Sequence, residues 1–142
     1  MLYFGLKTDV MEQNKLLIYI VDDDRIYGMV ATKTIKATGI DCAVVNFNSS
    51  LQCLAHLKDL LATPAKLPDF VFIDLNIPGM DAWRFVESLQ ELHSNEISRI
   101  KIYIMSSTKT EADGEKARSN RLIQGFLEKP VLKESFHLIL SP

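Results

Sequence analysis

The sequence has few cysteines and histidines, the residues that form disulfide bonds and common metal sites. Its two cysteines, Cys42 and Cys53, have no spacing typical of a disulfide framework or a zinc site. The three histidines, His56, His93 and His137, share no metal-ligand spacing with one another or with a cysteine. A glycine-rich phosphate loop of the nucleotide-binding type is also missing. We therefore expect a reduced protein in which both thiols pack into the core.

The sequence also lacks an excess of one charge and long apolar runs. The formal net charge of −2 gives no general attraction to nucleic acid or to anionic membranes. Basic residues outnumber acids between Arg99 and Lys133, which we interpret first as a solvated face and second as a docking surface. Residues 1–14 have neither the basic start nor the apolar stretch of a signal peptide. These absences predict a cytoplasmic protein that binds neither nucleic acid nor a membrane.

The chain has the size of a single domain. Its 142 residues, of which 47% are apolar, fit one globular core. The patterned sequence begins at Lys15, so residues 15–142 are predicted to form the domain and residues 1–14 a leader. One hypothesis takes residues 2–4 as a remnant of cloning and Met11 as the native start.

Short apolar runs alternate with segments of helical apolar spacing. The runs predict strands over 16–21, 42–47, 70–73, 100–105 and 125–127. The intervening segments predict helices over 25–38, 50–62, 82–92, 111–120 and 133–140, with Gly39 ending the first. Strands that are apolar throughout and separated by helices are typical of parallel sheets covered on both faces. The predicted fold class is therefore α/β, a doubly wound (βα)5 sheet of five buried parallel strands.

Polar side chains follow these strands where each one ends. In such sheets the ligand crevice lies beyond the carboxyl ends of the strands, so residues distant in sequence converge there. The residues at these ends are Asp22, Asp23, Asp74, Ser106, Ser107 and Lys129. We expect all of them at one edge of the sheet.

The acidic residues at this edge predict a magnesium site. Carboxylates that lie together at strand ends repel one another, so such a cluster is favourable mainly where a cation offsets the repulsion. Asp22, Asp23 and Asp74 supply hard oxygen ligands, which suit Mg²⁺ better than a softer ion. A carboxylate beside Mg²⁺, with a lysine and a hydroxyl nearby, has the parts needed for phosphoryl transfer to an aspartate. Asp24 is interpreted as the N-cap of the first helix rather than as a ligand.

Four motifs in this order resemble the receiver domain of two-component response regulators. They are Asp22-Asp23, the segment Asp74-Leu75-Asn76-Ile77-Pro78-Gly79-Met80-Asp81, Ser106-Ser107 and Lys129-Pro130. The resemblance extends from Lys15 to about Leu140 and implies the flavodoxin-like strand order 2-1-3-4-5, with a cis Lys129-Pro130 peptide. Ala82 departs from the family pattern, which usually has glycine there, and Ser106 replaces the commoner threonine.

The resemblance also implies a role for each residue of the site. Asp74 would be the phosphoacceptor and take a phosphoryl group from a sensor histidine kinase or a phosphotransfer protein. Mg²⁺ would be held by Asp23 and Asp74 directly, by the backbone carbonyl of Asn76, and by Asp22 through water. Lys129 would bind a phosphoryl oxygen.

The resemblance further implies a switch that follows phosphorylation. Ser106 would move to hydrogen bond the phosphoryl group, and the aromatic ring of Phe126 would rotate inward with it. Partners would bind the face formed by residues 111–120, the last strand and residues 133–140, on a monomer or a phosphorylation-dependent dimer. The chain would not be an enzyme, although it would assist its own phosphorylation and dephosphorylation.

Two other functions stay open at this point. A haloacid-dehalogenase-type phosphatase also uses an aspartate nucleophile, Mg²⁺, a hydroxyl and a lysine, but it needs a second aspartate where this sequence has Asn76. A degenerate receiver that only binds proteins would not need the intact set of Asp22, Asp23, Asp74 and Lys129. Both alternatives therefore fit the residues less well than a phosphoacceptor.

Overall fold

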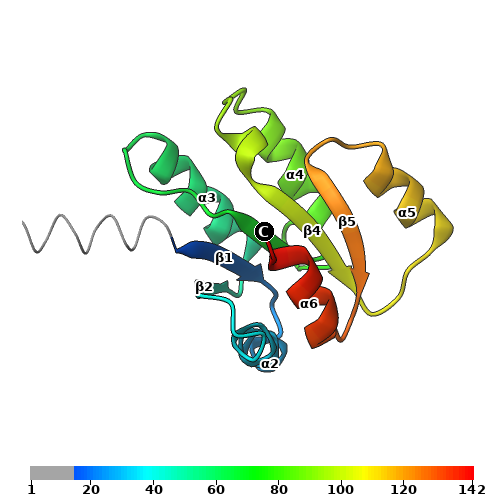
Figure 1. The fold of residues 1–142 in the computed structure, drawn as a ribbon. Coiled ribbons are helices and arrows are strands. Elements are labelled where there is room, and N and C mark those ends of the chain that lie inside the picture. Colours follow the sequence, from blue (N-terminus) through cyan, green and yellow to red (C-terminus); the bar gives the residue numbers. More distant parts are fainter. Residues whose placement is uncertain (1–14) are drawn as a thin grey trace, which may run out of the picture.

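Five parallel strands form one sheet with helices on both faces (Figure 1). The computed structural model describes residues 15–142, and the predicted leader, residues 1–14, lies outside the described residues. The strands are β1 (Leu16–Val21), β2 (Cys42–Phe47), β3 (Phe70–Asp74), β4 (Lys101–Ser106) and β5 (Ile123–Glu128). The helices are α2 (Arg25–Lys36), α3 (Ser50–Leu61), α4 (Ala82–Gln90), α5 (Glu111–Arg118) and α6 (Lys133–Leu140). The strand order β2-β1-β3-β4-β5 confirms the predicted doubly wound fold.

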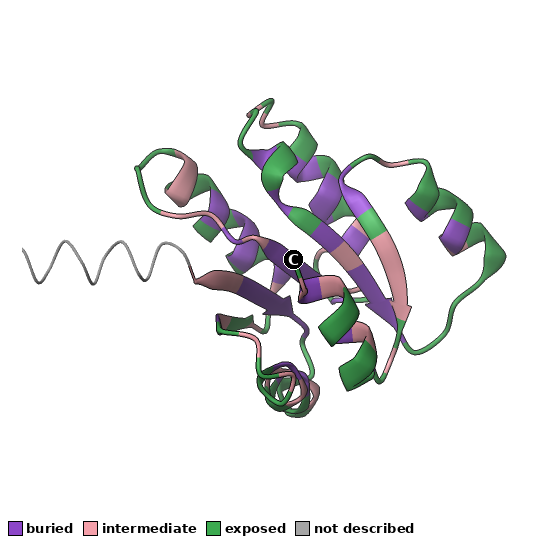
Figure 2. Cartoon of the chain, in the orientation of Figure 1, coloured by how far each residue is buried: buried purple, intermediate pink, exposed green. Residues whose placement is uncertain are grey.

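The core consists of two apolar layers, one on each face of the sheet. Ile18 and Ile20 of β1 pack in the layer covered by α2 and α6, whereas Tyr19 and Val21 pack in the layer under α3, α4 and α5. This division follows from the geometry of a strand, because successive side chains point to opposite faces. The central strands are buried over most of their length, as Figure 2 shows in purple.

The prediction that all five strands are buried is wrong for the two edge strands. In β2, Val45 is 39% exposed and Asn46 is exposed as well. In β5, Gln124 is exposed. An edge strand has a neighbour on one side only, so its side chains receive less cover than those of β1 and β3. The structure also contains a 3₁₀ turn over Ile97–Arg99 that the sequence did not predict.

Capping residues fix the helix ends near the carboxyl edge of the sheet. The Asp24 carboxylate accepts hydrogen bonds from the backbone N–H groups of Ile26 and Tyr27 at 3.0 and 3.1 Å, which confirms it as the N-cap of α2. Asp81 is the N-cap of α4 and accepts one hydrogen bond, from the backbone N–H of Arg84 at 2.9 Å, and the methyl group of Ala82 is fully buried. None of the helices within residues 15–142 has the length and apolarity needed to cross a bilayer.

Candidate functional site

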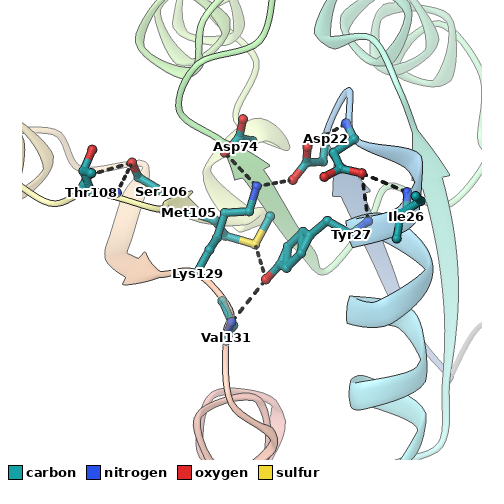
Figure 3. A network of polar contacts seen from close by, with 10 residues as sticks. Asp22, Ile26, Tyr27, Asp74, Met105, Ser106, Thr108, Lys129 and Val131 are labelled. Carbon is teal, nitrogen blue, oxygen red and sulfur yellow. Dashed lines mark hydrogen bonds and ion pairs between the residues drawn. The ribbon is translucent and has the colours of Figure 1, made fainter.

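The site lies at the carboxyl edge of the sheet, where four neighbouring strands end (Figure 3). Asp22 directly follows β1, and Asp74 is the last residue of β3. Ser106 ends β4, and its carbonyl accepts a hydrogen bond from the backbone N–H of Lys129 at 2.8 Å. Parallel pairing thus brings together the predicted residues, which are up to 107 positions apart in the chain.

Three carboxylates form an acidic cluster at this edge. Oxygen atoms of Asp22, Asp23 and Asp74 all lie within 4.8 Å of one another. Asp22 is only 3% exposed, Asp74 is half-buried and Asp23 is exposed to solvent. A buried carboxylate with two like-charged neighbours is unfavourable without a cation. Three converging hard oxygen donors are the ligand chemistry that Mg²⁺ takes, so the residues present fit this ion.

Lys129 provides a cation within the chain itself. Its Nζ lies 2.8 Å from Oδ2 of Asp22 and 3.2 Å from Oδ1 of Asp74. Burial alone would lower the pKa of the Lys129 ammonium, but the hydrogen bond and charge of Asp22, followed by the charge of Asp74, raise it above its ordinary value. The lysine therefore stays charged and links the two carboxylates.

The pKa of Asp74 is raised above its ordinary value. Burial is the largest cause and the negative charge of Asp22 the second, and together they outweigh the opposing effect of Lys129. The ionised form of Asp74 is thus less favourable than that of a carboxylate in water. An added cation would relieve this cost.

The hydroxyl of Ser106 is turned to the loop after β4. Its Oγ donates to the carbonyl of Thr108 at 2.7 Å and lies 3.2 Å from the Thr108 backbone nitrogen, which donates to it. Ser106 is buried, so the hydroxyl is held in this turn between β4 and α5. To contact a group on Asp74, the side chain must first break these two hydrogen bonds.

The other predicted residues lie around this cluster. Asn76 is exposed and comes two residues after Asp74. The ring of Phe126 in β5 is half-buried, and the Nζ of Lys109 lies 5.9 Å from its centroid. The Lys129-Pro130 peptide is cis, as the resemblance implied.

Tyr27 of α2 also belongs to the site, although sequence reasoning missed it. Its hydroxyl accepts a hydrogen bond from the backbone N–H of Val131, and the Nζ of Lys129 lies 4.3 Å from the centroid of its ring. Tyr27 comes one helical turn after the capping residue Asp24, which returns it to the carboxyl edge of the sheet. An aromatic residue at this helical position was the available signal.

Comparison with known proteins agrees with this geometry. The family model of the response regulator receiver domain matches residues 18–141. A two-component response regulator from Cytophaga hutchinsonii has a similar fold, with a TM-score of 0.82 at 20% identity over 89% of this chain and 95% of its own. A response regulator receiver protein from Dyadobacter fermentans has a TM-score of 0.76 at 27% identity, covering 88% and 94% of the two chains.

A third structural neighbour is the chemotaxis protein CheY4 of Vibrio cholerae. It has a TM-score of 0.70 at 17% identity, over 89% of this chain and 96% of its own. No curated protein sequence matches the chain significantly. Because the family model covers most of the chain, the match is not confined to the acidic site. The protein therefore belongs to the response regulator receiver domain family, the signalling domain of two-component systems.

Proposed function

We propose that this receiver domain accepts a phosphoryl group on Asp74 from the phosphohistidine of a sensor kinase or a phosphotransfer protein. One observation carries the proposal. The half-buried carboxylate of Asp74 lies beside two further carboxylates, and the Lys129 ammonium is 3.2 Å away. An aspartate in such a setting can act as a nucleophile toward phosphorus while cations on both sides offset the phosphoryl charge.

The acidic cluster supplies the ligands for Mg²⁺. We assign Asp23 and Asp74 to direct contacts, the backbone carbonyl of Asn76 to a third, and Asp22 to a contact through water. When bound, the ion neutralises negative charge on the phosphoryl oxygens. Asp22 is also held by Lys129, which keeps its buried carboxylate in place beside the other two.

The chemical step joins one oxygen of Asp74 to phosphorus as the bond from phosphorus to the donor imidazole breaks. The electron pair of the broken bond stays on the imidazole nitrogen, and Asp74 becomes an acyl phosphate. Lys129 lies close enough to Asp74 to contact a phosphoryl oxygen on the product. The charge of the new group, about −1.5 to −2 at neutral pH, is larger than that of the carboxylate it replaces.

This charge supports a switch in the loop that follows β4. The Ser106 hydroxyl exchanges its two bonds to Thr108 for a bond to the phosphoryl group, and β4 carries the change to the neighbouring β5. Phe126 of β5 is half-buried, so its ring still has exposed surface that an inward rotation would bury. We place the resulting partner-binding surface over α5, β5 and α6. Phosphorylation would shift the population of molecules from one packing of this surface to another.

The donor protein also needs a surface to dock on. Its phosphohistidine has to reach Asp74, so the docking surface must surround the acidic cluster. Large apolar side chains are exposed along α2, which starts at the site, at Ile26, Met29 and Val30. Met29 and Asp22 line one hollow of about 400 Å³. Exposed apolar patches of this kind mark interaction surfaces, and we assign this one to the donor.

The test is chemical phosphorylation of the purified chain. Incubation with acetyl phosphate and Mg²⁺ should add the mass of one phosphoryl group, and the Asp74→Asn variant should show no addition. Asp81→Asn is the matched control, because it changes a nearby carboxylate but keeps an N-capping side chain. Labelling that survives in Asp74→Asn would place the acceptor elsewhere. Steady release of phosphate from phosphomonoesters would favour the phosphatase alternative.

A further inference from the structure

Tyr27 connects three parts of the site without belonging to the acidic cluster. Its ring lies beside the Lys129 ammonium, with 4.3 Å between Nζ and the ring centroid. Its hydroxyl accepts a hydrogen bond of 3.2 Å from the backbone N–H of Val131 and donates to the sulfur of Met105 at 3.9 Å. One side chain from α2 therefore contacts β4 and the segment that carries Lys129 (Figure 3).

The contact with Val131 fixes the backbone next to the lysine. Val131 is buried, so its N–H group needs a protein partner, and the Tyr27 hydroxyl supplies one. This hydrogen bond ties the start of α2 to the chain two residues after Lys129. The path of the backbone between β5 and α6 is thereby set from the α2 side of the site.

The contact with the ring restricts the lysine side chain itself. A lysine has a long flexible stem and in water would sample many directions. The face of an aromatic ring attracts an ammonium group, so the Tyr27 ring favours those rotamers in which Nζ stays near Asp22 and Asp74. Burial is the main cause that raises the pKa of Tyr27, so the hydroxyl stays protonated at neutral pH.

We infer that Tyr27 is a positioning residue, which holds Lys129 in place to meet the phosphoryl group on Asp74. This inference rests on the proposed function. Preorganised charges accelerate a reaction more than mobile ones, because no reorganisation is needed when the charge develops. The ring and the hydroxyl contribute separately, and substitutions can divide their effects.

Two substitutions separate these contributions in the acetyl phosphate assay. Tyr27→Phe keeps the ring but leaves the Val131 N–H group unpaired, and we expect labelling of Asp74 to slow by about fivefold. Tyr27→Leu removes both contacts, and we expect labelling to slow by about twentyfold. Tyr103→Phe is the matched control, because this half-buried tyrosine of β4 packs on Phe72 at a distance from Lys129 and should label at the wild-type rate.

A double-mutant cycle tests whether Tyr27 acts through Lys129. In a Lys129→Met background, the further change Tyr27→Leu should leave the labelling rate unaltered, because the lysine that Tyr27 positions is gone. A tyrosine that merely supports the fold would slow labelling equally in both backgrounds. Wild-type rates for both Tyr27 variants, or equal slowing in both backgrounds, would overturn the inference. Thermal melting checks that the variants are folded.

The outcome can be told apart from a failure of the proposed function. If the wild-type chain takes up no phosphoryl group at Asp74, the proposed function is wrong. The ¹⁵N resonance of the Lys129 side chain then decides the inference alone. A signal that becomes solvent-like in Tyr27→Leu but not in Tyr103→Phe supports the positioning role, and an unchanged signal in Tyr27→Leu overturns it.

Discussion

Lys129 and Asp22 form a largely buried ion pair, with 2.8 Å between Nζ and Oδ2, although 107 positions separate them in the chain. This distance is shorter than the 3.2 Å between the same ammonium and Asp74. Asp22 thus holds the lysine at the site while Asp74 keeps an oxygen for other partners. The ammonium therefore offsets part of the repulsion among the carboxylates in the protein without metal.

Removal of the lysine should therefore be costly only while no metal is bound. Lys129→Met leaves the carboxylate of Asp22 buried without its cation, and we expect a loss of roughly 3 kcal/mol in the free energy of unfolding in EDTA. Saturating Mg²⁺ should recover much of this loss, because an ion that binds only the folded state stabilises that state. Denaturant unfolding with EDTA and with Mg²⁺ measures both effects.

Lys15→Met is the matched control for this substitution. Lys15 pairs with Asp41 at 3.6 Å on the surface, where both side chains are exposed. Its removal should change stability by less than about 1 kcal/mol, with or without Mg²⁺. A Lys129→Met variant that is as stable in EDTA as the wild type would contradict the proposed importance of the ion pair.

Asp74 should make stability depend on pH in a defined direction. Because its pKa in the folded state is raised above the ordinary value of 3.8, the folded protein is favoured below that pH and loses stability as the pH rises through the raised pKa. In EDTA, Asp74→Asn should therefore stabilise the protein at neutral pH, by roughly 1 kcal/mol. The gain should vanish below pH 3.8.

Unfolding experiments in EDTA over this pH range measure the gain directly. Asp41→Asn serves as control, since it removes an exposed carboxylate and should change stability by at most about 0.5 kcal/mol. If Asp74→Asn destabilises the protein at neutral pH, the attraction of Lys129 outweighs burial and the charge of Asp22, contrary to our interpretation.

Asp24 should stabilise helix α2 and should have no part in Mg²⁺ binding. Its carboxylate accepts from two backbone N–H groups of α2, and the oxygen cluster consists of Asp22, Asp23 and Asp74. Asp24→Ala should cost about 1 kcal/mol of stability through the lost cap, whereas Asp24→Ser should restore most of it. Both variants should bind Mg²⁺ with the wild-type affinity, which isothermal titration can measure. A tenfold loss of affinity in both would make Asp24 part of the metal site.

Ser106 should transmit phosphorylation but not be needed for it. Ser106→Ala removes the hydroxyl that bonds to Thr108 in this structure. We expect acetyl phosphate to label this variant on Asp74, while beryllofluoride no longer shifts the NMR signals of the Phe126 ring. Ser106→Thr keeps a hydroxyl and should keep the shift, and so should Ser107→Ala, which changes an exposed neighbour. A normal Phe126 shift in Ser106→Ala would remove the serine from the switch.

The sequence predicts the fold and most of the site for one physical reason. Apolar runs and helical spacing determine the elements, and parallel strands bring their carboxyl ends to one edge, so Asp22, Asp74 and Lys129 meet there. Exposure of the edge strand β2 is not predictable in this way. An apolar pair such as Val44 and Val45 predicts a strand, but it does not indicate whether that strand lies at the edge or in the centre of the sheet.

Two further features depend on contacts between distant segments. The role of Tyr27 depends on how α2 lies beside the segment after β5, since Tyr27 and Val131 are 104 positions apart. The direction of the Ser106 hydroxyl depends on the path of the loop at Thr108. An aromatic residue one turn into α2 is a local signal, but it does not identify Val131 as the partner, and no local pattern sets the direction of the Ser106 hydroxyl.

The exposed apolar side chains of α2 should speed phosphotransfer from a protein donor but should have no effect on phosphorylation by a small molecule. Met29 is 61% exposed and Val30 is 49% exposed, and both lie in the first half of α2, which starts beside the acidic cluster. Replacing both by serine removes apolar contact area without adding charge near the acidic cluster. We expect phosphotransfer from a histidine kinase that labels the wild-type chain to slow by about tenfold, because a lost contact of about 1.4 kcal/mol has this effect. Labelling by acetyl phosphate should be unchanged.

Leu138→Ser is the control for this double substitution. Leu138 is 80% exposed on α6, which runs away from the site. Its replacement should therefore leave the rate of phosphorylation unchanged with either donor. Equal slowing with both donors would show that the α2 substitutions disturb the site itself. Unchanged phosphotransfer from the kinase would place the docking surface elsewhere, because a donor that contacts α2 must lose binding energy when these side chains are cut back.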